Sequence, residues 1–151
     1  MKSLILSMLI VFSLNAGLND DNQEELKEKL KAMPVEKFAR ILANKTASAV
    51  PIKIDAITTV TKVIALDNSI SYFKSIDLNH EIMKGKWENK SEYFKTVMFD
   101  QDSKMVCRVD FLNHMIINKG LVLKYYYTDR DYRPLFNYSV NKNDCLKLEE
   151  E

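Results

Sequence analysis

The C-terminal part of the chain contains the stretch GLVLKYYYTDRDYRPLFNYSV, residues 120–140, whose pattern of apolar residues decides the fold class. Side chains alternate across a strand, so residues 121–128 form a strand whose apolar face holds Leu121, Leu123, Tyr125 and Tyr127. Residues 129–133 are polar and predict a turn. The chain then returns in a second strand, whose apolar face holds Phe136, Tyr138 and Val140. The stretch therefore predicts an antiparallel hairpin with one buried side.

The segment upstream predicts a second hairpin. Residues 54–66 are rich in Ile, Val and Thr, which favour strands. Residues 69–76 alternate between apolar and polar side chains, as a half-buried strand does. The polar residues Asp67 and Asn68 join the two strands as a short turn. Two hairpins without a crossover strand predict a four-stranded antiparallel sheet.

Helical spacing of apolar residues fills most of the remaining chain. It predicts helices over residues 23–32, 34–46 and 91–105. A short helix over residues 110–118 is followed by Gly120, which suits a left-handed cap. The predicted fold class is α+β: an antiparallel four-stranded sheet of two hairpins, with helices packed on one face and one disulfide.

The N-terminus has the pattern of a secretion signal. A charged start is followed by the apolar run 4–14 and then by small or polar residues. The run is shorter than the roughly 20 apolar residues that a membrane-spanning helix needs. We therefore expect a signal peptide over residues 1–17, cleaved between Ser13 and Leu18, and a mature protein that is periplasmic or secreted.

The rest of the chain has the length of one domain. Residues 22–146 are expected to form a single α+β domain, and residues 147–151 an acidic C-terminal tail. No second apolar run is long enough to cross a bilayer, so we expect no integral membrane segment in the mature chain. The 22 basic and 21 acidic residues nearly balance. A near-neutral chain offers no electrostatic basis for binding nucleic acid or an anionic membrane.

The two cysteines, Cys107 and Cys145, are expected to form a disulfide. Thiols oxidise after export, and an even cysteine count in that setting indicates a disulfide framework. The 37 intervening residues suit a structural bridge, and there is no C-x-x-C redox motif. A Cys107 nucleophile paired with His114 is the alternative chemistry for these residues.

Catalytic and metal-binding signatures are absent from the sequence. His80 lies in a polar loop near Asp77 and Glu81, but zinc sites need three or four ligands at defined spacing. We interpret this group as a solvated loop, and we assign no catalytic residue, metal ligand or cofactor.

The three tyrosines 125–127 have two interpretations. Alternation makes Tyr125 and Tyr127 core residues and leaves Tyr126 exposed. Aromatic residues are also enriched at interfaces, so the last hairpin is the candidate recognition surface, formed by Lys124, Tyr126, Tyr132 and Arg133.

A set of short motifs extends along the chain, at residues 50–55, 58–63, 106–107, 115–116, 120, 123–129 and 143–145. Within this set, the two cysteines bracket a unit of glycine, strand and aspartate. With these motifs, residues 40–146 resemble a family of small secreted bacterial proteins, the quorum-sensing-regulated virulence factor family, and the paired cysteines carry most of the resemblance. The resemblance implies a periplasmic or secreted α+β domain of a Gram-negative bacterium. It implies no reaction, cofactor or catalytic residue.

Three functional hypotheses follow from the sequence. The first is a non-enzymatic exported protein that binds another, unknown protein in a virulence or envelope process. The second is a periplasmic protein that binds a small apolar ligand between sheet and helices. The third is an envelope hydrolase that uses the loop of Asp77, His80 and Glu81.

Overall fold

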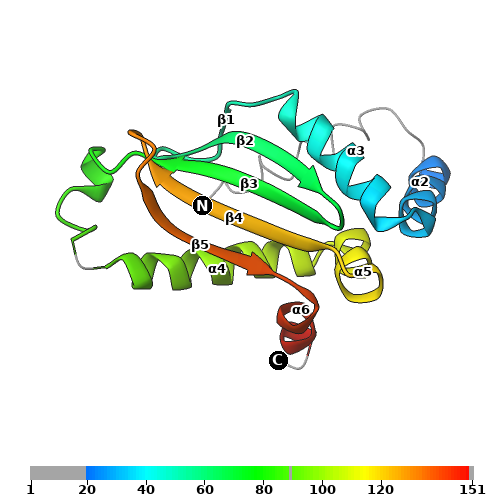
Figure 1. Ribbon diagram of the computed structural model, residues 1–151. Helices are drawn as coiled ribbons and strands as arrows, with labels where there is room; N and C mark the ends of the chain where they lie inside the picture. The colour runs from blue at the N-terminus through cyan, green and yellow to red at the C-terminus, as the bar shows by residue number, and fades with distance from the viewer. Residues whose placement is uncertain (1–19, 89, 150–151) are drawn as a thin grey trace.

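A five-stranded sheet forms the centre of the computed structural model, which describes residues 20–88 and 90–149 (Figure 1). The strands follow one another across the sheet in chain order. They are β1 (Ile52–Lys53), β2 (Thr58–Leu66), β3 (Ser69–Ile76), β4 (Val122–Asp129) and β5 (Pro134–Val140). The predicted signal peptide over residues 1–17 lies outside the described residues.

The two predicted hairpins, β2–β3 and β4–β5, are confirmed as antiparallel pairs. The prediction of a wholly antiparallel, four-stranded sheet is wrong, because β3 and β4 pair in parallel, from Ser69 opposite Val122 to Ile76 opposite Asp129. Residues 77–121 contain two helices and return the chain to the end of the sheet where β3 began. A connection of that length is what a parallel pair requires.

The fifth strand, β1, also departs from the prediction, which placed one continuous strand over residues 54–66. Asp55 interrupts that run, because its carboxylate accepts hydrogen bonds from the backbone N–H groups of Ile57 and Thr58 at 2.8 and 2.7 Å. Such an aspartate turn bends the chain back on itself. β1 therefore pairs antiparallel with β2 at the edge of the sheet, with Ile52 opposite Val60.

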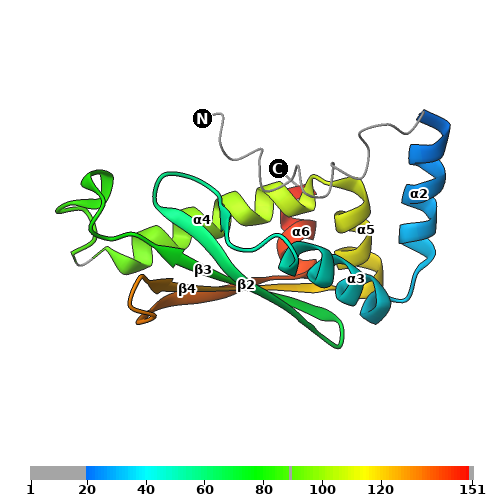
Figure 2. The same ribbon diagram turned by 90° about the horizontal axis from the view of Figure 1, so that it is seen from above.

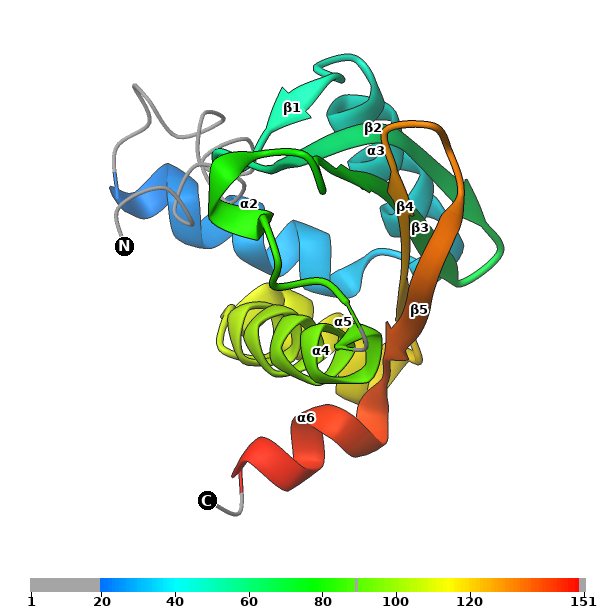
Figure 3. The ribbon, with the colours of Figure 1, turned by 90° about the vertical axis from the view of Figure 1, so that its left-hand side faces the viewer.

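The helices cover one face of the sheet, as predicted, and no helix among residues 20–88 and 90–149 covers the other (Figures 2 and 3). α3 packs on β2, and α4 lies along β5. The described helices are α2 (Asp20–Ala32), α3 (Val35–Ala47), the 3-10 turn η1 (Glu81–Met83), α4 (Ser91–Cys107), α5 (Asp110–Lys119) and α6 (Lys142–Glu149). We call the covered side of the sheet the inner face and the bare side the outer face.

The hydrophobic core fills the space between the inner face and the helices. Along β4, Leu123, Tyr125 and Tyr127 are buried and Tyr126 is exposed, which confirms the alternation in the sequence. Helices α3 and α5 contribute further large buried groups, such as Phe38 and Met115. At the end of α5, Gly120 adopts a left-handed conformation with φ of 73°, as its position predicted.

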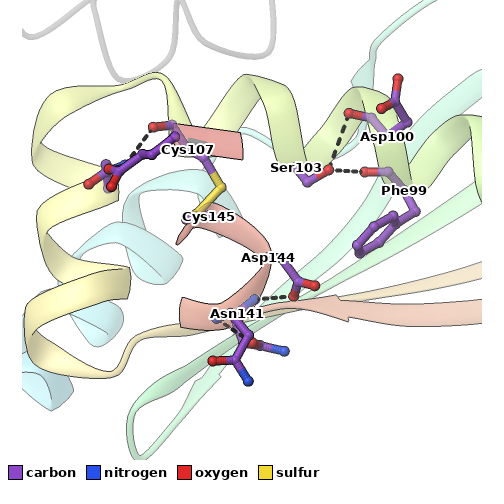
Figure 4. Close-up of a disulfide and its surroundings, with 10 residues drawn as sticks. Phe99, Asp100, Ser103, Cys107, Asn141, Asp144 and Cys145 are labelled. Atoms are coloured by element: carbon purple, nitrogen blue, oxygen red, sulfur yellow. Dashed lines mark hydrogen bonds between the residues drawn. A yellow bond between two sulfur atoms is a disulfide. The ribbon is translucent and has the colours of Figure 1, made fainter. Parts of the chain in front are cut away.

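The disulfide joins the end of α4 to the start of α6 (Figure 4). The Cα atoms of Cys107 and Cys145 lie 5.3 Å apart, and both side chains are buried. Helix α6 was not predicted, although its start carries a signal. Asn141 caps the helix: its side-chain oxygen accepts from the Asn143 N–H, and its own N–H donates to Asp144, each at 2.9 Å. That reciprocal pattern is a capping box.

Candidate functional site

A lysine in the middle of the sheet faces the hydrophobic core. Lys74 shares the inner face of β3 with Ile70, Tyr72 and Ile76, and only 6% of its surface is exposed. Its ammonium lies 3.0 Å from Oδ2 of Asp102 on α4 and donates to the hydroxyl of Tyr127 at 3.0 Å. A charge at this depth is tolerated because an opposite charge and hydrogen bonds surround it.

The carboxylate of Asp102 is the centre of this buried network. It accepts a hydrogen bond from the Tyr138 hydroxyl at 2.7 Å and from the Tyr127 hydroxyl at 3.2 Å, in addition to its contacts with Lys74. The ammonium also lies 4.6 Å from the centre of the Tyr125 ring, which is a cation–π distance. Three strands and one helix therefore meet at a single ion pair.

The pKa values of Lys74, Tyr127 and Tyr138 are raised in this network. Burial raises the pKa of the Tyr138 hydroxyl, and the nearby negative charge of Asp102 raises it further. Burial likewise raises the pKa of Tyr127. Burial, the largest single effect, would lower the pKa of Lys74, but the attraction and hydrogen bonds of Asp102 and Tyr127 together outweigh it and hold that pKa above its ordinary value. The lysine is therefore charged and the tyrosines neutral at physiological pH.

An apolar pocket of about 100 Å³ lies beside the network, between the inner face and the helices. Its floor consists of buried side chains, including Val60 and Leu123, and its rim of half-buried ones, including Ile52, Tyr72 and Met105. The lining residues are Thr46, Ile52, Ile54, Val60, Tyr72, Lys74, Asp102, Met105, Val106, Leu112, Leu123 and Tyr125.

The four residues of the predicted recognition surface separate into two places. Lys124 and Tyr126 lie on the outer face of β4. Tyr132 and Arg133 lie at the turn before β5, where the Tyr132 side chain is 77% exposed. The Arg133 guanidinium donates to Asp129 at 2.6 Å and to Asp131 at 3.2 Å, so its charge is already paired.

The polar loop of Asp77, His80 and Glu81 is held by local bonds. Asp77 accepts from the Asn79 N–H at 3.2 Å and pairs with Arg130 at 3.2 Å. His80 Nδ1 accepts from the Ile82 N–H and so caps η1. Within residues 20–88 and 90–149, no three or more His, Cys, Asp or Glu side chains form a group that could hold a metal ion.

A nucleophilic role for Cys107 is also ruled out by its bond to Cys145. The His114 ring instead interacts with the Asn118 side chain, at 3.2 Å.

The ion pair and its pocket were missed at the level of sequence. The signal for Lys74 was present, because it falls in phase with Ile70, Tyr72 and Ile76 on an alternating strand. No comparable signal marks Asp102, since α4 carries two other acidic residues, Glu92 and Asp100. Only the three-dimensional fold shows which of them faces the sheet.

Comparison with known proteins identifies the fold. No family model matches the chain. No curated protein sequence matches it either. A crystal structure of a Pseudomonas aeruginosa protein described as secreted matches with a TM-score of 0.60 and 17% identity, over 77% of this chain and 96% of that chain. The pilotin EpsS of the Vibrio vulnificus type 2 secretion system matches with a TM-score of 0.59 and 13% identity, over 76% and 94%.

The type II secretion pilotin AspS of Vibrio cholerae matches with a TM-score of 0.56 and 12% identity, over 76% of this chain and 95% of that one. At these identities the likeness is one of fold. The chain therefore shares the α+β fold of these three proteins. No helix among the described residues has the length and apolar character needed to cross a membrane.

Proposed function

We propose that this chain is an exported, non-enzymatic domain that acts by binding another protein of the cell envelope. Its fold is similar to that of a protein described as secreted and of two secretion-system pilotins, which supports this role. The disulfide fits an oxidising compartment. A cleaved signal peptide over residues 1–17 and a periplasmic or secreted location belong to the proposal. So do a part in virulence and membership of the quorum-sensing-regulated virulence factor family.

The size of the inner-face pocket carries the proposal. Pockets for drug-sized ligands have volumes of roughly 300–1,000 Å³. A volume of about 100 Å³ instead suits one apolar side chain. Interfaces obtain much of their binding energy from a few such anchors that enter pockets. A side chain of a partner protein can enter the pocket at its half-buried rim, which Ile52 and Met105 form in part.

The buried network supports binding rather than catalysis. The ammonium of Lys74 and the carboxylate of Asp102 are the charged groups in the pocket wall. Both are already paired with each other and with tyrosine hydroxyls. A general acid or base must reach its substrate, whereas these groups are committed to holding the strands and α4 together.

Photo-crosslinking at the rim tests the proposal. A photoreactive amino acid replaces Met105 in the full chain, expressed in the cells that make it. We expect one discrete adduct with an envelope protein, and we expect Ile52→Trp in the same chain to abolish it by filling the rim. The matched control is Ile82→Trp, because Ile82 is exposed on η1 and does not line the pocket. Absence of an adduct, or equal loss with the control, would contradict the proposal.

A small apolar ligand is the second candidate, and the lining of the pocket favours it. Apolar side chains, among them Ile54 and Leu112, make up most of the wall. A cavity of about 150 Å³ lined by such groups binds benzene, so a molecule the size of benzene is the largest ligand expected in this pocket. Native mass spectrometry of the gently purified protein tests this candidate. A co-purifying mass would favour it, and a clean apo spectrum would remove it.

A further inference from the structure

The outer face of the sheet has an unbalanced charge. Lys53 on β1, Lys62 on β2 and Lys124 on β4 all point away from the helices, since their strand neighbours face the core. None of these lysines forms an ion pair with a carboxylate that the structure describes. The acidic residue within the five strands, Asp129, is buried and bound by Arg133. The outer face is therefore positive, although the whole chain is nearly neutral.

An aromatic pair of an exposed Tyr126 and a half-buried Phe73 lies among these lysines. The rings of Phe73 and Tyr126 stack at 5.0 Å with an interplanar angle of 13°, and the Lys62 ammonium lies 5.6 Å from the centre of the Phe73 ring. The three residues stand in one row across β2, β3 and β4. In the adjacent row Ile64, 41% exposed, lies two positions along β2 from Lys62. The face thus offers rigid apolar groups beside unpaired positive charges.

Stability of the sheet explains the stacked rings but not the charges. Cross-strand aromatic pairs stabilise a sheet, and so do pairs of opposite charge. The direct cross-strand neighbours of Lys124 are Ser71 and Ser139, on β3 and β5. Either position would accept a glutamate that neutralised Lys124. The lysines therefore lack the partners that the sheet itself would favour.

We propose that the outer face is a second docking surface and that its occupant is an acidic segment of a partner protein. Carboxylates of the segment pair with Lys53, Lys62 and Lys124, and an apolar side chain packs against Tyr126. Complementary charge steers such partners together and makes the association sensitive to salt. This surface lies on the opposite side of the sheet from the pocket, so it does not depend on the function proposed above.

A titration of the oxidised domain with a synthetic hexaglutamate peptide, followed by amide NMR shifts, tests the inference. We expect shifts confined to the strands that carry the three lysines, and an affinity that falls as salt rises from 25 to about 150 mM. The double variant Lys62→Gln with Lys124→Gln should weaken binding by about fivefold, since each exposed ion pair contributes modestly.

The control is Lys37→Gln with Lys119→Gln, which removes two exposed lysines from α3 and α5. It should change the affinity by less than about twofold. Equal weakening by both double variants, or shifts on the helices, would overturn the proposal in favour of unspecific attraction. Vesicles of phosphatidylglycerol provide the last arm. If the protein binds the vesicles through these lysines but does not bind the peptide, the surface is a membrane contact and the proposal of a protein partner is overturned.

Discussion

At the scale of single residues, Lys74 and Asp102 determine how tightly the sheet and α4 are joined. Taking two charges out of water costs several kcal/mol, and their attraction repays this only with good geometry and further hydrogen bonds. Both conditions are met here, since the hydroxyls of Tyr127 and Tyr138 donate two further hydrogen bonds to the Asp102 carboxylate. The contribution of the ion pair to stability is therefore measured most clearly by removing one of its two residues.

Replacing one partner of this pair should destabilise the protein strongly. Asp102→Asn leaves the Lys74 ammonium buried without an opposite charge, and we expect the free energy of unfolding to fall by about 3–5 kcal/mol. The double variant Lys74→Met with Asp102→Leu removes both charges and should recover most of that loss. Urea unfolding followed by circular dichroism measures both. A double variant as unstable as Asp102→Asn would show that packing, rather than charge, dominates.

The raised pKa values predict instability in alkali. The ordinary pKa of a tyrosine or lysine in the unfolded chain lies near pH 10. Above that pH, a group whose pKa is raised in the folded state keeps its proton there but loses it in the unfolded state. The free energy of unfolding should therefore hold below about pH 10 and fall as the pH rises further. Tyr138→Phe should reduce that slope, and Tyr93→Phe, at an exposed site, should not. Urea midpoints between pH 8 and about pH 11.5 provide the test.

At the scale of elements, the disulfide is the tie between α4 and α6. Cys107 lies at the end of α4, and the short α6 packs against α4 and α5. An isolated helix as short as Lys142–Glu149 would be marginal in water. Its position therefore depends on the bridge, on the Asn141 cap and on packing against its neighbours.

Removing the disulfide should lower stability and loosen α6. In the chain-entropy model, closing a loop of this length stabilises the fold by about 4 kcal/mol. We expect Cys107→Ser with Cys145→Ser to lose about that much, measured as a shift of the urea midpoint. Amide hydrogen exchange should rise first over residues 142–149. Unchanged exchange in α6 would show that packing alone holds the helix.

Helix α2 should contribute little to the stability of the domain. It packs against α5, and its described contacts include the Lys31–Asp110 ion pair at 2.7 Å and the half-buried Leu30. We expect a chain that starts at Met33 to fold, with a loss of about 1–2 kcal/mol for the exposed apolar surface. Thermal unfolding measures this. A truncated chain that fails to fold would place α2 within the core unit.

Local patterns predicted the two hairpins and Gly120, because alternation and turn residues act over a few positions. The parallel pairing of β3 with β4 depends on where α4 and α5 bring the chain back to the sheet. The interruption of the predicted first strand depends on one carboxylate, that of Asp55. Neither follows from periodicity. The same holds for the candidate site, since the partner of Lys74 lies 28 residues away on another element.

At the scale of the whole molecule, the sheet separates two different surfaces. Its inner face carries the core, the ion pair and the pocket, and its outer face carries an aromatic pair and lysines that form no ion pair within the described part of the chain. The pilotins and the Pseudomonas protein share the arrangement of elements, at identities of 12–17%. Because a fold by itself does not define a function, the two surfaces are where partners should be sought.

The parallel pairing of β3 and β4 also bears on the order of folding. Every residue pair in that ladder is separated by 53 positions in the chain, as Ser69 and Val122 are. Pairing between segments so distant in sequence slows folding, because the entropy of closing the intervening loop is lost before the contacts form. If the chain is exported N-terminus first, as proposed, β1, β2 and β3 emerge before β4. In that case the centre of the sheet would close only after β4 has crossed the membrane.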